Sequence, residues 1–474
     1  MAKEKKLVHL PYAGTKVRKI EYFGYATGMI GYQIQNTLMG IYLLMFMTTI
    51  LKIPMLYAGS VTLVCRFVDA ITDILFGTIG DRTHTQLGSF RPWYITMAIP
   101  ACLAFMIMFM CPGFVTPGTS FALYWIYFIY LVYGSLFTTI MYTSYSAFTS
   151  VATADDGERK KLVLARQVGL NLSGIVVAAA TPVMMYFGGG VTNSEAAFKA
   201  LGIFVAIVSG ICYLICGLSI RERVCLNAGK SMPIKESFKV FKGNKIFLGA
   251  LICNVLHSIG IAMFGGMMSY YFLYYKMNPG LMSQSQLVAA IVATAVSLLV
   301  MPVMMRKLPR IGMYWIGVGV FSILMLIGYF AGMYAISGYL MCSAFTVGMM
   351  IVYAVTFSFI PDAVDYGEWR NGVAAPGMVN TVLSFIQKVT TGFGTMLTSV
   401  LLSAVGFEAA NGFEQTEAAR EGIRLVTCLV PSIFFCVSAL GLIFLKVRAD
   451  KMQEIRNELK ERRAVAEEKA VEKQ

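Results

Sequence analysis

Charged residues are scarce in this 474-residue chain: Asp, Glu, Lys and Arg make up 14% of it, whereas hydrophobic residues make up 57%. A soluble globular protein carries roughly 25% charged residues. So few charges cannot cover so much apolar surface in water, which excludes a disordered chain, a secreted disulfide scaffold and an ordinary cytosolic enzyme. The composition predicts a protein that lies in a lipid bilayer.

The residues of common catalytic and metal centres are also few. The three histidines are far apart in the sequence, and the ten cysteines form no C-x-x-C pair. The chain has no H-E-x-x-H, P-loop or G-x-S-x-G motif. We therefore expect no enzymatic activity and no cofactor, and we expect free buried thiols in place of disulfides.

Long apolar segments are abundant instead. A transmembrane helix needs about 20 largely apolar residues. The chain is therefore predicted to be an all-α membrane protein with twelve transmembrane helices. They lie near residues 20–50, 55–80, 93–111, 121–150, 164–187, 199–220, 246–275, 285–305, 313–336, 338–360, 378–404 and 423–446.

Basic residues are divided unevenly between the two sides of this arrangement. The terminal segments and the loops on their side contain 31 Lys and Arg residues, whereas the opposite loops contain five. Because basic loops stay in the cytoplasm, we expect a protein of the cell membrane with both termini in the cytoplasm. The net charge of +14 then reflects insertion, and no nucleic-acid partner is expected.

The longest polar interruption, residues 221–245, separates the first six segments from the last six. It predicts a cytoplasmic linker between two pseudo-symmetric six-helix bundles, 1–220 and 246–446, as in carriers built from repeats. A charged cytoplasmic tail, 447–474, follows.

The tail contains one candidate helix. Met452, Ile455 and Leu459 form an apolar stripe at helical spacing among alternating charges. We expect this helix to lie against the membrane surface.

Three charged residues lie deep in the second segment. Offsets of three and four place Arg66, Asp69 and Asp73 on one helix face, with Thr72 beside them. Charges inside the hydrocarbon cost at least ~2.5–3.5 kcal/mol each, which makes them functional candidates. Two carboxylates one turn apart suit Na+ or a proton, and the alternative is a structural ion pair of Arg66 with Asp69.

A basic residue of the eleventh segment can balance these acids. Lys388 lies about ten residues into that segment, too deep for easy snorkelling, which is the alternative. Arg66 and Lys388 would neutralise Asp69 and Asp73 in the absence of a cation, and a bound cation would release them. We expect this exchange to couple cation binding to the substrate.

Polar and aromatic residues of the first and fourth segments predict a substrate cavity. Hydroxyl and amide groups beside aromatic rings can hydrogen-bond to a polyhydroxylated ligand and stack on it. For each residue, a hydrogen bond between helices is the alternative. The residues are Tyr32, Gln33, Gln35, Asn36, Thr138, Thr139, Tyr142, Thr143, Ser144, Tyr145 and Ser146.

Two motifs carry a family resemblance. Asp69-Ala-Ile-Thr-Asp73, with the G-S-F-R-P-W sequence that ends at Trp93, closely resembles the glycoside-pentoside-hexuronide:cation symporters. Asp362-Ala-Val-Asp365-Tyr-Gly-Glu368 resembles that family's D-x-V-D/E-Y-G-E loop. The resemblance implies the major facilitator fold and symport of a sugar, glycoside or hexuronide with Na+, Li+ or H+. We expect a functional monomer.

The resemblance also implies roles for single residues. The family's cation ligands map onto Asp69, Thr72, Asp73 and Thr139. At the sugar site, Gln33 and Tyr142 stand where family members have aspartates, whereas an arginine is kept as Arg166. Fewer carboxylates favour an anionic sugar such as a glucuronide. The expected substrate-binding residues are Gln33, Asn36, Tyr142, Tyr145, Ser146 and Arg166.

Charged loop residues are expected to gate the carrier by contacts that open and close. They are Asp81, Arg82 and Arg91 in the first half and Asp365 and Glu368 in the second. Solvated surface charge is the alternative for each of them.

Other functions stay open. The chain could be an uncoupled facilitator or a carrier of lysolipids on the same fold. A membrane sensor is the alternative from another class.

Overall fold

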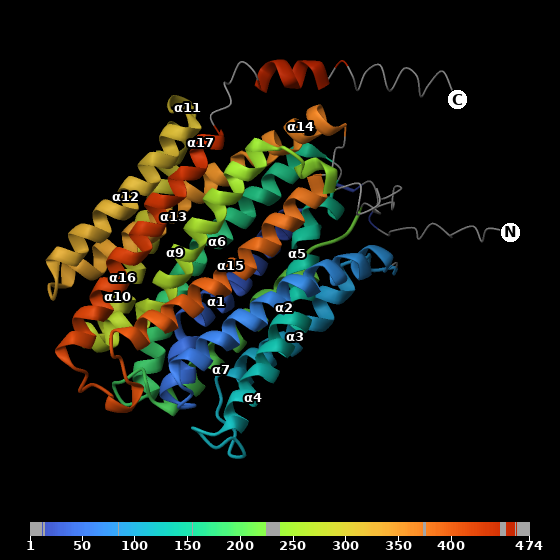
Figure 1. The fold of residues 1–474 in the computed structure, drawn as a ribbon. Coiled ribbons are helices and arrows are strands. Elements are labelled where there is room, and N and C mark those ends of the chain that lie inside the picture. Colours follow the sequence, from blue (N-terminus) through green and yellow to red (C-terminus); the bar gives the residue numbers. More distant parts are fainter. Residues whose placement is uncertain are drawn as a thin grey trace.

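The computed structural model describes residues 12, 15–83, 85–153, 155–223, 238–372, 376–445, 452–459 and 461. Within these ranges the chain forms helices and no β-strand (Figure 1). The first half contains α1 (Lys19–Thr49), α2 (Met55–Arg82), α3 (Arg91–Met108), α4 (Ser120–Leu131), η1 (Val132–Thr138), α5 (Thr139–Val151), α6 (Asp156–Phe187) and α7 (Glu195–Ser219).

The second half begins with η2 (Phe238–Phe241) and ends with the short α17. Most of the predicted linker, residues 224–237, lies outside the described residues. The remaining elements are α9 (Lys245–Tyr270), η3 (Tyr271–Tyr275), α10 (Pro279–Ala295), η4 (Val296–Val300), α11 (Met301–Lys307), α12 (Arg310–Ala331), α13 (Ala335–Ser358), α14 (Ile360–Asn371), α15 (Pro376–Ala404), η5 (Ala409–Asn411), α16 (Glu417–Ser438), η6 (Ala439–Gly441) and α17 (Leu442–Leu445).

Each predicted span coincides with a helix or with a run of consecutive helices. Ten of them are long and apolar enough to cross a membrane. The other two, α1 and α15, have 31 and 29 residues and are therefore also long enough, but they carry the polar side chains expected at the site. Polar residues gather on these two helices because both face the interior of the protein.

Side chains at the helix starts explain several boundaries. The Asp155 carboxylate accepts a hydrogen bond from the Glu158 amide, so α6 begins well before the apolar segment predicted from residue 164. Ser194 and Thr416 cap α7 and α16 in the same way. The capped helix starts lie in polar sequence, so these helices are longer than the apolar segments from which they were predicted.

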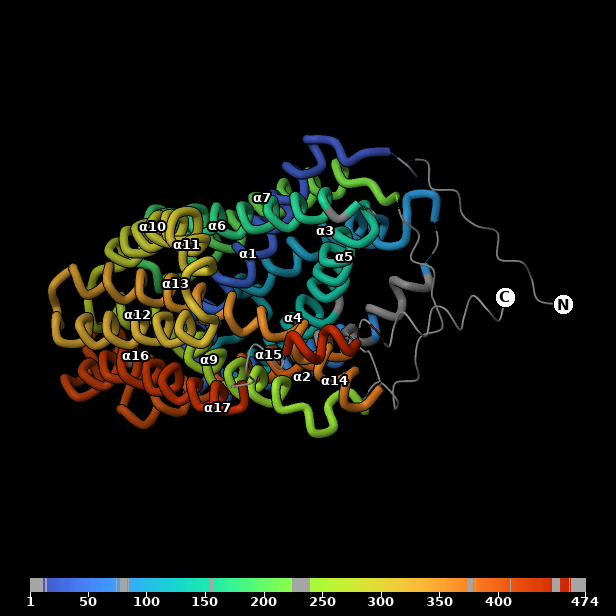
Figure 2. The backbone as a smooth tube through the Cα atoms, turned by 90° about the horizontal axis from the view of Figure 1, so that it is seen from above, coloured from blue at the N-terminus to red at the C-terminus, as the bar shows by residue number. Residues whose placement is uncertain are grey.

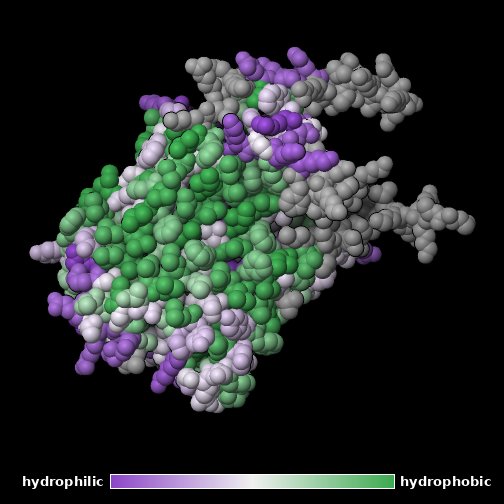
Figure 3. Space-filling view, viewed as in Figure 1, coloured by the Kyte–Doolittle hydropathy of each residue, from purple (hydrophilic) through white to green (hydrophobic). Residues whose placement is uncertain are grey.

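The outer surface is apolar. Large hydrophobic side chains such as Leu299 and Phe330 are 71% and 74% exposed. Figure 3 shows hydrophobic residues across the middle of the molecule and hydrophilic residues near its two ends. Such a continuous apolar band is expected where lipid replaces water.

Helices of the two halves meet along the centre. α2 runs beside α15, and α1 packs against α6, α7 and α9 (Figures 1 and 2). A Cβ atom on Gly59 would lie 2.7 Å from the Ser399 hydroxyl, and one on Gly392 would lie 3.0 Å from the Arg66 Cβ. Glycine therefore permits the close approach of α2 and α15.

Hydrogen bonds join the halves near the end of α1 and the start of α10. The Thr48 and Tyr270 hydroxyls lie 2.8 Å apart, and the Ser269 hydroxyl donates to the Ile41 carbonyl at 2.9 Å. The Ser283 hydroxyl donates to the Ala178 carbonyl at 2.7 Å. The halves are thus closed against each other at this end.

The tail helix (residues 452–459) does not lie as the sequence suggested. Met452, Ile455 and Leu459 are 6%, 2% and 3% exposed because they pack in the core of the protein. The expectation that this stripe faces the membrane surface is wrong. Polar contacts with α14, described below, hold the helix on the protein; the rest of the tail is outside the described residues apart from residue 461.

Candidate functional site

A cavity between the two halves of the chain lies at the centre of the molecule. Helix α1 supplies Tyr32 and Asn36, and α2 supplies Arg66 and Asp69. The remaining lining residues are Met39, Tyr133, Gly134, Thr138, Tyr142 and Lys388. Because Lys388 comes from α15, the cavity is built by both halves of the chain, as expected for a carrier site between two repeats.

Asp69 is the buried acid of this cavity, with 3% of its surface exposed. Its Oδ1 atom accepts a hydrogen bond from the Ser135 hydroxyl at 2.8 Å. A Cβ atom on Gly134 would lie 2.4 Å from the same carboxylate. The carboxylate therefore fits against the backbone of the fourth span only because residue 134 is glycine.

Ser135 was missed by the sequence reasoning, which started the polar cluster at Thr138. It lies in η1, a π-helical turn inside the span, so its side chain leaves the regular α-helical faces. Single π-turns inside helices occur frequently at functional sites. The signal available in the sequence was the small Gly134-Ser135 pair in an otherwise bulky apolar segment.

Asp73 pairs with the lysine of the other half. The Lys388 amine lies 2.5 Å from Asp73 Oδ2 and donates to the Asp69 carbonyl at 3.5 Å. The Asp73 Oδ1 atom has no hydrogen-bond partner. Lys388 thus stands beside the two carboxylates in the place where the sequence predicted a cation.

Arg66 does not form the predicted alternative ion pair. In the described part of the chain it forms no ion pair; its Nη2 atom donates to Asn36 Oδ1 at 3.5 Å, and its Nε atom has no partner. Asp69 and Arg66 still share the cavity wall. The geometry therefore gives the pairing role to Lys388.

The hydroxyls of the other two predicted cation ligands, Thr72 and Thr139, donate to backbone carbonyls and not to the Asp69 carboxylate. The Thr72 hydroxyl donates to the Asp69 carbonyl of its own helix at 3.0 Å. The Thr139 hydroxyl donates to the Gly134 carbonyl at 3.0 Å. Each would have to rotate from its present hydrogen bond to reach a cation held by the carboxylates.

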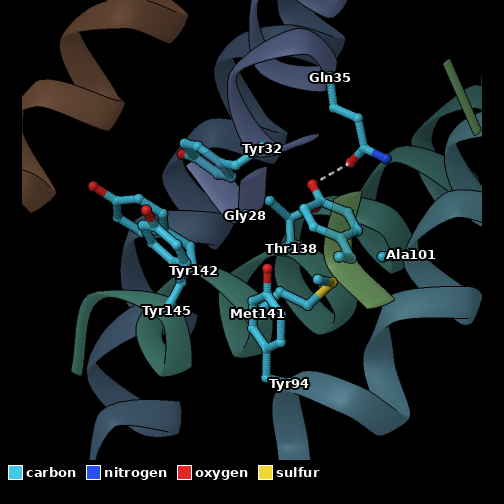
Figure 4. A pocket seen from close by; sticks show the side chains of 10 residues that line it. Gly28, Tyr32, Gln35, Tyr94, Ala101, Thr138, Met141, Tyr142 and Tyr145 are labelled. Atoms are coloured by element: carbon cyan, nitrogen blue, oxygen red, sulfur yellow. Dashed lines mark hydrogen bonds between the residues drawn. The ribbon is translucent and has the colours of Figure 1, made fainter. Parts of the chain in front are cut away.

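A second cavity adjoins the first and is lined by aromatic rings (Figure 4). Tyr32 and Tyr142 line both cavities and stack with their ring centroids 4.4 Å apart. Tyr145 lines the second one and stacks on Tyr25 at 4.5 Å. These rings offer flat apolar faces of the kind that carry a sugar ring.

Arg166 reaches this aromatic region from α6. Its Nη2 atom donates to the Tyr142 hydroxyl at 3.3 Å. Among the described residues, no acidic side chain forms an ion pair with Arg166, and its hydrogen bond goes to a tyrosine hydroxyl. Within the described residues, the positive charge near Tyr142 therefore has no acidic partner.

Two polar residues predicted for the cavity, Gln33 and Ser146, form local hydrogen bonds, whereas Gln35 lines the second cavity (Figure 4). Gln33 donates to the Thr37 hydroxyl at 3.0 Å, and Ser146 donates to the Thr143 carbonyl at 2.9 Å, both within their own helix. Gln35 is 1% exposed and is held by Tyr133, Ser209 and other buried groups. Gln33 and Ser146 therefore form hydrogen bonds within their own helices, and Gln35 forms hydrogen bonds between helices.

The predicted gate residues of the first half lie within that half. Arg91 donates through Nε to the Gly217 carbonyl at 2.9 Å, and its amide donates to Glu222 Oε1 at 2.6 Å. The side chains of Asp81 and Arg82 lie outside the described residues. Arg91 therefore fastens the start of α3 to the end of α7.

The second half has an acidic cluster on α14. Arg310 and Arg456 approach the two oxygens of Asp362 at 2.7 and 2.6 Å, and Arg456 also lies 3.5 Å from Asp365. Glu368 follows Asp365 on the next turn of α14. Asp362 was quoted in the motif but not proposed as a site, because its partner Arg456 lies 94 residues away in the tail.

Comparison with known proteins decides the family. A family model described as MFS/sugar transport protein matches residues 24–449. The chain belongs to this family. It is a membrane transporter of the major facilitator fold and not an enzyme, as the sequence predicted.

Individual relatives agree with this membership. The chain is 28% identical to an isoprimeverose transporter of Lactiplantibacillus pentosus, over 91% of this chain and 89% of the relative. It is 24% identical to a putative sulfoquinovose importer of Escherichia coli, over 96% and 97% of the two chains. The crystal structure of a D-xylose-proton symporter has the same fold, with a TM-score of 0.60 at 13% identity and coverage of 90% and 96%.

Proposed function

We propose that this chain is a symporter that couples uptake of a sugar or glycoside to a monovalent cation, Na+ or H+, at Asp69 and Asp73. In this proposal it acts as a monomer in the cell membrane, with both termini in the cytoplasm and the halves 1–220 and 246–446 moving against each other. Relatives that are named as a sugar transporter and a symporter support this general class of function.

The contact of Lys388 with Asp73 carries the coupling proposal. Lysine on α15 and aspartate on α2 belong to different halves, so their ion pair joins the two bodies that alternating access must move. A cation at Asp69 and Asp73 competes with the lysine amine for the same oxygens. A ligand shifts a conformational equilibrium only through a difference in affinity between two states, and this competition supplies that difference.

The charge of the cavity favours an anionic substrate. Arg66, Lys388 and Asp69 line the cavity, and Arg166 donates to the hydroxyl of Tyr142 in its wall. A carboxylate or sulfonate on the sugar would pair with Arg166 while its ring stacks on Tyr32 and Tyr142. One of the relatives is named as a putative sulfoquinovose importer.

Uptake into proteoliposomes tests the function. We expect inward Na+ or H+ gradients to drive accumulation of methyl glucuronide or sulfoquinovose above that of isoprimeverose. Uptake that is independent of both gradients would show an uncoupled facilitator. Preference for isoprimeverose would overturn the proposal that the substrate is anionic.

Membrane potential distinguishes the two substrate classes independently. A potential of 100 mV contributes roughly 2.3 kcal/mol per charge, or about 50-fold accumulation for a neutral sugar with one cation. An anionic sugar with one cation carries no net charge, so we expect its uptake to be insensitive to the potential.

A further inference from the structure

Ser135 in η1 holds one oxygen of the cavity acid Asp69. The residue is 6% exposed, and its hydroxyl donates to Asp69 Oδ1 at 2.8 Å. In the described part of the chain, no other group donates a hydrogen bond to this carboxylate. The neighbouring hydroxyls of Thr72 and Thr139 donate to backbone carbonyls instead. Ser135 is therefore the hydroxyl that fixes the orientation of the Asp69 carboxylate.

The residue before Ser135 confines the same carboxylate by close packing. A Cβ atom on Gly134 would lie 2.4 Å from Asp69 Oδ1 and 2.7 Å from Oδ2. Gly134 and Asp69 both line the central cavity. Two consecutive residues of η1 thus meet Asp69, one through its backbone and one through a hydrogen bond. The acid cannot approach the fourth span further, and its Oδ1 atom is tied to that span.

Each carboxylate of the acid pair has one engaged oxygen and one available oxygen. Lys388 approaches Asp73 Oδ2, and Asp73 Oδ1 is buried without a partner. Ser135 engages Asp69 Oδ1, and among the described residues no donor reaches Oδ2. The two acids are one helical turn apart, which brings them within reach of one ion. A cation can therefore bind Asp69 Oδ2 and Asp73 Oδ1 before any existing bond is broken.

The two acids differ in how firmly they are held. Asp69 is 3% exposed and is tied to a short hydroxyl side chain, whereas the partner of Asp73 is the amine of a long, flexible lysine. A site selects among hard cations by its size, its number of oxygen ligands and its rigidity. Asp69 is thus the rigid wall of the site, and a rigid wall cannot move inward to contact a smaller ion.

We propose that Ser135 is a positioning residue for the coupling cation, which holds Asp69 Oδ1 so that Oδ2 is presented to Na+ and the site prefers Na+ to Li+. This inference rests on the proposed function and deepens it, because it assigns Na+ as the coupling ion. A proton bonds to a single oxygen, whereas two available oxygens on neighbouring turns suit a metal cation. Without the serine hydroxyl, Asp69 is free to close on the smaller Li+.

Cation binding to the purified full-length carrier tests this role without any sugar. NaCl and LiCl are titrated separately at constant ionic strength, and binding is followed by calorimetry. In Ser135→Ala we expect Na+ affinity to fall about tenfold, as for the loss of one hydrogen bond to a charged group. Li+ affinity should fall less, because the released carboxylate can adjust to the smaller ion. The ratio of Na+ to Li+ affinity should therefore decrease.

Conservative variants separate positioning from damage to the fold. Ser135→Thr keeps the hydroxyl and should keep the ratio of Na+ to Li+ affinity found in the wild type. Ser135→Cys has a similar size but a weaker donor, so its ratio should lie between those of the wild type and Ser135→Ala. Ser432→Ala in α16, which removes a hydroxyl bonded to the Cys428 carbonyl of its own helix, should change neither affinity.

The outcomes separate this inference from the proposed function. An unchanged Na+ affinity in Ser135→Ala would overturn the positioning role, and so would an equal loss of Na+ and Li+ affinity. A wild type that binds neither ion and takes up sugar under a proton gradient alone would overturn the inference and leave the proposed function in place. No uptake of methyl glucuronide, sulfoquinovose or isoprimeverose under either gradient would instead overturn the proposed function.

Discussion

Two acid–base clusters in this protein differ in how completely the acid is paired. Asp362 on α14 is buried, and each of its oxygens contacts an arginine, Arg310 or Arg456. Asp73 in the cavity pairs through one oxygen with Lys388 and leaves the other without a partner. The first cluster is saturated, whereas the second is open to an additional ligand.

The difference indicates which acid can exchange partners. A cation at Asp362 would have to displace two bidentate-capable guanidinium groups, which bind carboxylates strongly. At Asp73 it meets one amine, a compact and strongly hydrated charge on a flexible stem. The cavity cluster therefore suits a cycle of binding and release, and the α14 cluster suits a lasting contact.

Replacing Asp73 should have the largest effect on coupling. Asp73→Asn removes one of two negative charges from the cation site, and a charged partner contributes about 1.5–3 kcal/mol. We expect cation affinity to fall by roughly 100-fold and cation-stimulated uptake to disappear. Glu195→Gln, which breaks an exposed pair with Lys199, is the matched control. Unchanged stimulation in Asp73→Asn would place the cation elsewhere.

Replacing Lys388 sharpens the comparison in the opposite direction. Lys388→Met leaves the partly exposed Asp73 without its basic partner, at a cost below the ~3–5 kcal/mol that a fully buried pair would lose. We expect a lower melting temperature in cation-free buffer and a larger rise on adding cation than in the wild type, measured by thermal denaturation. An equal rise in melting temperature on adding cation to the variant and to the wild type would show that the lysine and the cation do not compete.

The cavity cluster was largely predictable, and the α14 cluster was not. Asp69, Asp73 and Lys388 stand out because charges are rare in apolar spans and helical spacing fixes their shared face. Asp362 lies in a polar segment, where one more charge carries no signal, and its arginines come from distant parts of the chain. Tertiary packing alone brings them together.

Smaller misses have similar physical causes. Ser135 escaped notice because a π-turn shifts the helical faces, which the regular period cannot show. The tail stripe was assigned to the membrane because an apolar face does not reveal whether lipid or protein covers it. The predicted spans, by contrast, follow from the bilayer's demand for long apolar helices: ten of them coincide with helices long and apolar enough to cross a membrane, and the other two with the long helices α1 and α15.

Replacing Gly134 should have an effect of intermediate size on cation affinity. Gly134→Ala places a Cβ atom about where the Asp69 carboxylate lies, so the acid must move or η1 must shift. We expect cation affinity to fall about tenfold, equivalent to 1.4 kcal/mol, with the carrier still folded. Gly319→Ala in α12, where a Cβ atom meets nothing within 4 Å, should leave cation affinity unchanged.

Replacing Asp362 should have the smallest effect on cation affinity and a distinct effect on the tail. In Asp362→Asn both arginines lose their charged partner, but each is more than 40% exposed and water can replace it. We expect about 1–2 kcal/mol of destabilisation and less than a twofold change in cation affinity. Because Arg456 is then held by Asp365 alone, trypsin should cleave after it faster than in the wild type. A loss of cation affinity as large as that of Asp73→Asn would show that the two clusters act as one, and the distinction between a saturated contact and an exchangeable one would fail.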